Sequence, residues 1–405
     1  MGPRGKSWCR RSLGLWTPLV LTLALFGDLA SRFVSYDRVA FRAWEAMIRG
    51  RPTGLGGMLA PNRRYTNDRS YGDLAAMGNY PSLRQYRREV FTTDEFGMRN
   101  RPAARSKPWG GILAGTSFSL GSGVNDDETL SERLGQILDT PIYNAARGDI
   151  GNEQQLRKML ERLGLKAGFM VLDITDGAPL PSVSDLRPEQ EGVPSDEWEA
   201  RFGPRTREFH MIRNTLRAWL AQSPLKLTIY QGFKRIEDDV ILPNRFADLV
   251  VREELSNGDP VLLATFQIRT LYSPPAIADA TGFCRGLATM LRRYHMDLLV
   301  VLIPSQYRIY GPLLRHPGER FGTDPILEGI ESGLRAGGVP VINLTPVLTA
   351  AARDGLAAHR YIYFRDDTHW NAQGIALAAT ALASKVREMM TAPGSIAGRA
   401  AIPPP

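Results

Sequence analysis

The sequence is poor in the residues that build metal centres and disulfide frameworks. Its 405 residues include two cysteines, Cys9 and Cys284, and five histidines, which leaves no disulfide framework and no metal–thiolate site to recognise. The Gly-rich fingerprints of P-loop and dinucleotide-binding proteins are missing. Basic runs interleaved with aromatic residues, the pattern expected of a nucleic-acid-binding protein, are missing too. The sequence therefore predicts no metal ligands, no organic cofactor and no nucleic-acid partner.

The overall composition is that of an ordinary globular protein. Hydrophobic residues make up 43% and charged residues 23% of the chain, which is enough apolar material for a large core. One large α/β domain with appendages fits this length better than several equal domains. The formal net charge of +8 fits either a basic soluble surface or attraction to an anionic partner, such as an acidic polysaccharide or lipid head groups.

The N-terminus has the pattern of an export signal. A basic cluster precedes an apolar stretch at about residues 13–26. We expect residues 1–36 to form a cytoplasmic basic tail and an uncleaved signal anchor, which places the rest of the chain in the periplasm as a single-pass inner-membrane protein. A cleaved signal peptide and a buried core helix are the alternatives. If the segment spans a membrane, Cys9 and Cys284 lie on opposite sides and cannot pair.

A regular alternation of strands and helices begins near Gly110. The order of short apolar strands and amphipathic helices predicts a parallel sheet with helices on its faces. We expect residues 37–108 to form an irregular lead-in segment, because turn signals occur throughout it. We expect residues 109–392 to form the α/β domain, with an insertion at about 177–260, and residues 393–405 to form a disordered tail.

A serine follows the first strand of this domain directly. The strand "GILAG" ends in Thr116 and Ser117, and Gly115 permits a sharp turn. In an open parallel sheet, ligands bind outside the carboxyl ends of the strands. Ser117 is therefore predicted to lie on the rim where a substrate binds, with its backbone N–H available to an oxyanion. A serine at this place acts as a nucleophile only when a base takes its proton.

One histidine has the neighbours that such a base needs. In "YFRDDTHWNAQG", His369 follows Asp367 by two residues and Asp366 by three. Either carboxylate could hold the imidazole Nδ1–H, so that Nε2 accepts the serine proton. Trp370 is expected to form a wall of the pocket. The alternative is a helix N-terminal cap with surface acids.

The two segments together resemble the SGNH/GDSL hydrolase-like family, and most closely its alginate O-acetyltransferase branch, the AlgX/AlgJ-like proteins. "GTSFS" is similar to the nucleophile block of that branch, and "DTHWN" to its acid/base block. The resemblance covers most of residues 88–390. It implies a three-layer α/β/α sandwich with a parallel, flavodoxin-like sheet. It also implies Ser117 as nucleophile, His369 as base and Asp367 as its partner, whereas the usual GDSL spacing selects Asp366.

The other family blocks depart from the pattern. In "YNAARGDIGNEQQ", Asn144 and Gly148 are the counterparts of the residues that usually support the oxyanion. The block with the usual oxyanion Asn is missing, and Thr175 or Asp176 stands in its place. A further pair, Tyr307 and Arg308, follows a later strand and is predicted either to contact a sugar or carboxylate or to form a solvated loop.

The resemblance implies a membrane-anchored SGNH-type enzyme that transfers an acetyl group through an acyl-serine to a polysaccharide hydroxyl. It also implies a partner, a membrane-bound O-acyltransferase that supplies the acyl group. An SGNH esterase or deacetylase is the first alternative. A non-catalytic polysaccharide-binding scaffold of a secretion complex is the second.

Overall fold

The computed structural model describes residues 4–31, 59–101, 107–188, 225, 229, 247–269, 273–317 and 325–391. The expected helix-like run at residues 210–222 and the expected disordered tail at 393–405 lie outside these residues.

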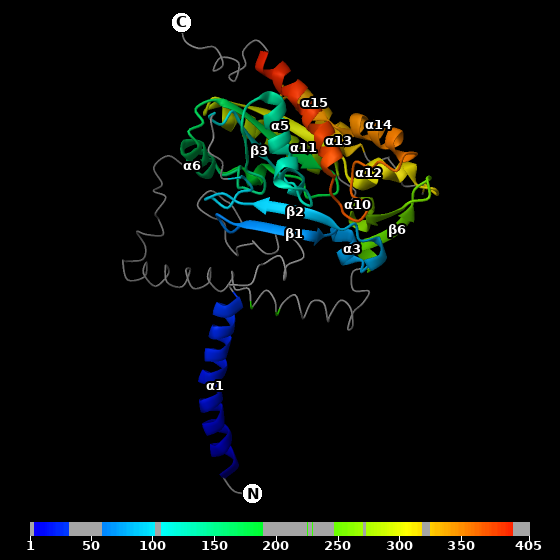
Figure 1. Ribbon diagram of the computed structural model, residues 1–405. Coiled ribbons are helices and arrows are strands. Elements are labelled where there is room, and N and C mark those ends of the chain that lie inside the picture. Colours follow the sequence, from blue (N-terminus) through cyan, green and yellow to red (C-terminus); the bar gives the residue numbers. More distant parts are fainter. Residues whose placement is uncertain are drawn as a thin grey trace.

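A five-stranded parallel sheet forms the centre of the α/β body (Figure 1). Its order is β4-β3-β5-β8-β9, and all four neighbouring pairs are parallel. The central strand β5 is buried along its whole length, which is why its sequence is a continuous apolar run. This sheet confirms the predicted α/β class. The strands are β3 (Gly111–Ala114), β4 (Ile142–Asn144), β5 (Gly168–Thr175), β8 (Met296–Ile303) and β9 (Val341–Asn343).

Helices cover both faces of the sheet, because alternate strand residues point to opposite sides. Leu113 and Val171 pack in one core with α5 (Leu130–Leu138), α14 (Thr345–Leu356) and α15 (Ala372–Thr391). Ile112 and Met170 pack in a second core with α6 (Glu153–Leu163), α11 (Pro274–Arg292) and α13 (Ile326–Ala336). The described residues therefore form three layers.

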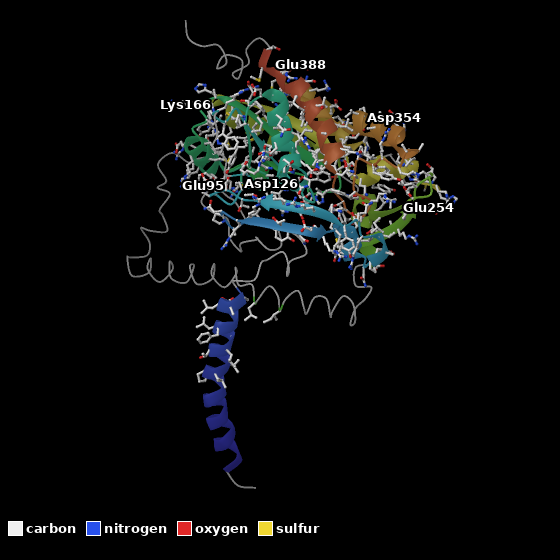
Figure 2. The ribbon with its side chains drawn as sticks, in the orientation of Figure 1. Glu95, Asp126, Lys166, Glu254, Asp354 and Glu388 are labelled. Atoms are coloured by element: carbon white, nitrogen blue, oxygen red, sulfur yellow. The ribbon has the colours of Figure 1, made fainter. Side chains whose placement is uncertain are left out.

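The outer faces of these helices are polar. Figure 2 shows Asp354 of α14 and Glu388 of α15 at the periphery of the body, and both are exposed. On α15, Leu382 and Val386 are fully buried on the opposite side. The amphipathic pattern that predicts a helix in the sequence thus also determines which face covers the sheet.

Two antiparallel strand pairs lie outside the main sheet. β1 (Arg64–Ser70) pairs with β2 (Arg87–Thr92), and β6 (Val250–Glu254) pairs with β7 (Pro260–Ala264). The first pair corrects the prediction that the lead-in segment is irregular. The sequence of β1, RYTNDRS, has few apolar residues, so it carries no readable strand pattern. The short elements are α3 (Asp73–Met77), η2 (Pro81–Leu83), α4 (Ser117–Leu120), η3 (Asp126–Glu128), η4 (Val183–Asp185), η6 (Ala247–Leu249), α10 (Thr265–Arg269), α12 (Gln306–Tyr310) and η7 (Gly311–Leu313).

The N-terminal basic and apolar segment forms one helix, α1 (Arg4–Ser31). Within the described part of the chain, no helix meets the combined length and apolarity needed to cross a membrane. The expected signal anchor therefore stays a prediction.

Candidate active site

Ser117 is held at the carboxyl end of β3 by a tight turn. Gly115 has φ +135°, and a Cβ there would lie 2.4 Å from Cγ of Asp173. The Asp173 carboxylate accepts hydrogen bonds from the backbone N–H of Thr116, at 2.9 and 3.0 Å, and of Ser119, at 3.1 Å. Burial raises the pKa of Asp173, and these N–H donors oppose that rise. Asp173 thus fixes the turn that presents Ser117, which begins the short helix α4.

The structure brings Ser117 and His369 together across 252 residues of sequence. His369 Nε2 lies 2.7 Å from Ser117 Oγ. On the other side of the ring, His369 Nδ1 lies 2.7 Å from Asp367 Oδ1, which also accepts the His369 backbone N–H at 3.1 Å. This arrangement lets Nδ1–H donate to the carboxylate while Nε2 accepts the serine proton.

Asp366, the alternative partner, has a different set of contacts. One of its carboxylate oxygens accepts the backbone N–H groups of Gly72 and Gln85, both at 2.8 Å. The other accepts a hydrogen bond from Arg87 Nη1 at 3.0 Å. Asp366 is fully buried, and burial raises its pKa while Arg87 lowers it. The geometry therefore selects Asp367 as the neighbour of His369.

Two charged residues from the lead-in segment also reach the site, and no sequence pattern pointed to them. Asp73, the first residue of α3, accepts hydrogen bonds from both the backbone N–H and Oγ1 of Thr368 at 2.7 Å. Its carboxylate lies 3.9 Å from His369 Nδ1. Arg87 on β2 donates from Nη2 to Asp367 Oδ2 at 3.0 Å.

A cavity of about 250 Å³ opens beside the serine. Ser117 and His369 line it together with Arg147, Thr175 and Phe266. Thr175 Oγ1 is buried and has no hydrogen-bond partner within the part of the chain that the structure describes. Ser117 is the first residue of α4, so its backbone N–H has no acceptor within that helix. Both residues line the cavity, so both groups are candidate donors to a ligand oxygen there.

Two predicted oxyanion residues do not line this cavity. The Asn144 amide donates to the Ser119 carbonyl at 2.9 Å and accepts the Ala146 N–H at 3.0 Å, so it stabilises the loop that follows Ser117. The Gly148 N–H donates to the Ala145 carbonyl at 2.9 Å within its own turn. The structure corrects both predictions, since these donors are already used. In their place, the exposed side chain of Arg147 lies at the cavity.

Of the other predicted site residues, some line the cavity and some are buried in the core. Asp176 lines the cavity, and Arg308 Nε donates to its carboxylate at 2.5 Å, which offsets its negative charge. Burial raises the pKa of Asp176, and Arg308 lowers it. Tyr307 and Trp370 are buried in the core. Trp370 packs edge-on against Phe118 at 5.5 Å between ring centroids, so it supports the cavity wall from behind. The prediction that Trp370 itself forms the wall is therefore wrong.

Asp73, Asp367 and His369 bring three candidate metal-ligand atoms within 4.8 Å of one another. In the structure these atoms already have protein partners. Asp73 binds Thr368, and Asp367 binds His369 and Arg87. The cluster is therefore explained by hydrogen bonds within the site.

Comparison with known proteins supports the resemblance inferred from the two sequence blocks. Residues 267–401 match the sequence model of a family described as "SGNH hydrolase-like domain, acetyltransferase AlgX". This match confirms the predicted similarity to the AlgX branch. No curated protein matches the chain. Among solved structures, one crystal structure aligns over 70% of this chain and 99% of its own, with 13% sequence identity and a TM-score of 0.33.

Proposed function

We propose, on the premise that residues 267–401 resemble the SGNH hydrolase-like domain of AlgX, that this protein is a serine-dependent O-acetyltransferase acting on a polysaccharide. The observation that carries the proposal is the pair of 2.7 Å hydrogen bonds that joins Asp367 to His369 and His369 to Ser117. Ser117 is partly exposed at the cavity, whereas His369 is buried behind it. A nucleophile, a base and an orienting carboxylate are thus in contact at a place that a ligand can reach.

The first half-reaction follows from this geometry. His369 Nε2 takes the Ser117 proton while Oγ attacks the carbonyl carbon of the acyl donor. The Ser117 N–H and the Thr175 hydroxyl donate to the oxyanion of the tetrahedral intermediate. The intermediate collapses when His369 returns the proton to the leaving group, and an acetyl-serine remains. Asp367 stabilises the imidazolium that exists in between.

The second half-reaction uses the same groups in the same order. A sugar hydroxyl enters the cavity. His369 takes the hydroxyl proton while the hydroxyl oxygen attacks the acetyl-serine carbonyl. The carbon–Oγ bond then breaks, His369 protonates Ser117 Oγ, and the acetylated sugar leaves. If water enters in place of the sugar, the same steps make an esterase or deacetylase.

The proposal includes a location and a source of the acyl group. Helix α1 exposes a series of large apolar side chains on the segment predicted to anchor the protein: Leu19, Val20, Leu21, Leu23, Leu25, Phe26 and Leu29. We place this helix in the inner membrane and the catalytic domain in the periplasm, next to a membrane-bound O-acyltransferase that supplies the acetyl group. Fractionation of cells that express the full chain tests this, because deletion of residues 4–31 then moves the protein from the membrane pellet to the soluble fraction. A full chain that is soluble from the start contradicts the anchor.

The chemistry is tested with the purified full chain, a chromogenic acetyl ester as donor and an oligosaccharide as acceptor. We expect Ser117-dependent release of the chromophore and an acetylated oligosaccharide detected by mass spectrometry. Ser117→Ala abolishes both, whereas Ser384→Ala, which changes an exposed serine on α15 outside the cavity, retains the activity. Hydrolysis without sugar acetylation supports the esterase. Polysaccharide acetylation in cells that is unchanged by Ser117→Ala supports the non-catalytic scaffold.

A further inference from the structure

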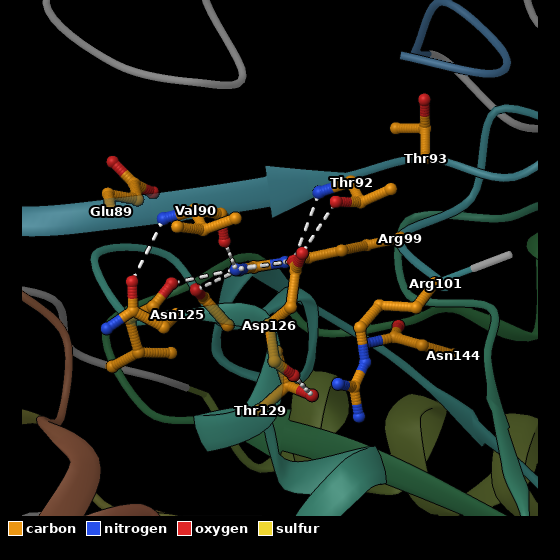
Figure 3. A network of polar contacts seen from close by, with 12 residues as sticks. Glu89, Val90, Thr92, Thr93, Arg99, Arg101, Asn125, Asp126, Thr129 and Asn144 are labelled. Carbon is orange, nitrogen blue, oxygen red and sulfur yellow. Dashed lines mark hydrogen bonds and ion pairs between the residues drawn. The ribbon is translucent and has the colours of Figure 1, made fainter. Parts of the chain in front are cut away.

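The lead-in segment contacts both halves of the site, and the first contact is on the serine side. Arg99 is buried and donates to the carbonyl of Leu120 at 3.1 Å and to that of Val124 at 2.7 Å. It also pairs with Asp126, whose carboxylate accepts the N–H of Thr92 at 3.0 Å (Figure 3). Burial lowers the pKa of Arg99, and Asp126 opposes this. The loop that follows Ser117 is thereby joined to β2.

The second contact is on the histidine side and is made by Arg87. Its guanidinium donates from Nη1 to Asp366 and from Nη2 to Asp367, both at 3.0 Å. The carbon of the guanidinium lies 3.7 Å from the centroid of the Phe364 ring. The Arg87 side chain is 13% exposed, and those of Asp366 and Asp367 are 0% and 4% exposed. Its orientation is therefore fixed by two carboxylates and one aromatic face.

The charges around Asp367 show what this arginine does. Asp366 and His369 lie on the same loop as Asp367, and Asp73 lies on α3, with its own N–H donating to Asp367 Oδ2 at 3.1 Å. Three carboxylates are thus close together and largely out of water. Like charges at such distances favour protonation of one member. A protonated Asp367 would lose its value as the acceptor for the imidazole proton, and Arg87 supplies the opposite charge that prevents this.

We propose that Arg87 is a positioning residue of the active site, which holds Asp367 ionised and directed at His369. The segment before the α/β domain then belongs to the catalytic apparatus. This inference rests on the proposed function for its rate effects. It also predicts a property of the resting protein, because the positive charge of Arg87 acts on the Asp367–His369 pair whether or not a substrate is present.

The test compares the full-length variants Arg87→Met, Arg87→Lys and Arg88→Met. Arg88 is the neighbouring arginine on β2, and its side chain is 62% exposed, so it is a matched control. For Arg87→Met we expect kcat for ester hydrolysis to fall about 100-fold with KM nearly unchanged. The acid limb of the pH–rate profile moves up by about one pH unit, because the Asp367–His369 pair binds its proton more tightly once the nearby cation is gone. Arg87→Lys keeps the charge but cannot bind both carboxylates as the guanidinium does, so its kcat falls about 10-fold.

A second measurement does not depend on turnover. In protein labelled with ¹³C-histidine, the His369 signal is identified by its loss in His369→Ala and followed with pH. We expect its midpoint to move to higher pH in Arg87→Met and to stay unchanged in Arg88→Met. The double variant Arg87→Met/Asp366→Asn recovers part of the shift, because the carboxylate that Arg87 offsets is then neutral. The inference is wrong if folded Arg87→Met matches the wild type in both the His369 titration and the pH–rate profile. If Arg87→Met does not fold, the same comparison is made with folded Arg87→Lys. If the His369 signals of the wild type and the variants behave as expected but the wild type does not hydrolyse the ester, the proposed function is contradicted instead.

Discussion

At the scale of single residues, two adjacent aspartates have separate tasks. Asp367 contacts the imidazole of His369, whereas Asp366 binds the backbone N–H groups of Gly72 and Gln85. For Asp367→Asn we expect kcat of ester hydrolysis to fall about 10³- to 10⁴-fold, because an amide that turns its NH₂ toward Nδ1 favours the wrong imidazole tautomer. KM should change little, since Asp367 is not expected to touch the substrate.

Asp127→Asn is the control for that variant. Asp127 is exposed, so the substitution removes the same charge away from the triad. Steady-state kinetics of both variants at pH 7 check the prediction. Wild-type kcat in Asp367→Asn would show that His369 is oriented by another group, and Asp73 would be the next to test.

A second prediction at this scale concerns Cys284, whose thiol is buried in the core formed with α11. Burial raises its pKa from 9.0 to about 12. Because the unfolded thiol ionises at lower pH, this group contributes stability that is complete below pH 9 and is lost as pH rises toward 12. We expect alkylation with iodoacetamide at pH 8, mapped by mass spectrometry, to modify Cys284 only when urea unfolds the chain. Rapid modification of the native protein would contradict this.

At the scale of elements, the turn between β3 and α4 depends on a glycine. For Gly115→Ala we expect the free energy of unfolding to fall by about 3 kcal/mol or more, because the new Cβ meets the Asp173 carboxylate and the backbone has φ +135°. Gly164→Ala is the matched control. Gly164 ends α6 at φ +64° with nothing within 4 Å, so alanine there costs only about 1–2 kcal/mol. Urea unfolding followed by circular dichroism measures both, and equal losses would disprove the contact argument.

The elements that the sequence predicts well are those with a local pattern. The apolar runs of β3 and β5 and the amphipathic repeats of α6 and α15 carry their own periodicity, which is independent of distant partners. The β1–β2 pair lacks such a pattern, because its stability comes from contacts with the rest of the fold. The sequence-derived view of a domain beginning near residue 109 reflects this limit.

The candidate site was likewise predictable only where a local sequence pattern marks its residues. Ser117 and His369 are recognisable because each lies in a short motif at the end of a strand or the start of a helix. Arg87 and Asp73 are not, since their partners are 279 to 295 residues away and nothing local distinguishes them from surface charges. Asn144 looked available in the sequence, but its amide is used by the Ser119 carbonyl. Whether a donor is free depends on the completed loop, which local spacing does not report.

At the scale of the whole molecule, three residues within the range 59–101 bind the loops that carry the candidate active-site residues. Arg99 holds the loop after Ser117, Arg87 holds Asp367, and Asp73 binds Thr368. A chain that begins at residue 109 loses all three and exposes buried charges that have lost their partners. We expect such a chain to have a Tm about 10 °C or more below that of the full chain, or to be insoluble, and to lose labelling of Ser117 by a fluorophosphonate probe.

A chain that lacks only residues 1–31 is the comparison, because it keeps these contacts. We expect it to retain the Tm and the fluorophosphonate labelling of the full chain in detergent-free buffer. If the chain beginning at residue 109 is soluble, folded and labelled at the full rate, the lead-in segment is a mere appendage. If it folds but is labelled slowly, the segment acts on the triad itself, and adding Arg87→Met to the chain lacking residues 1–31 should slow the labelling by a similar factor.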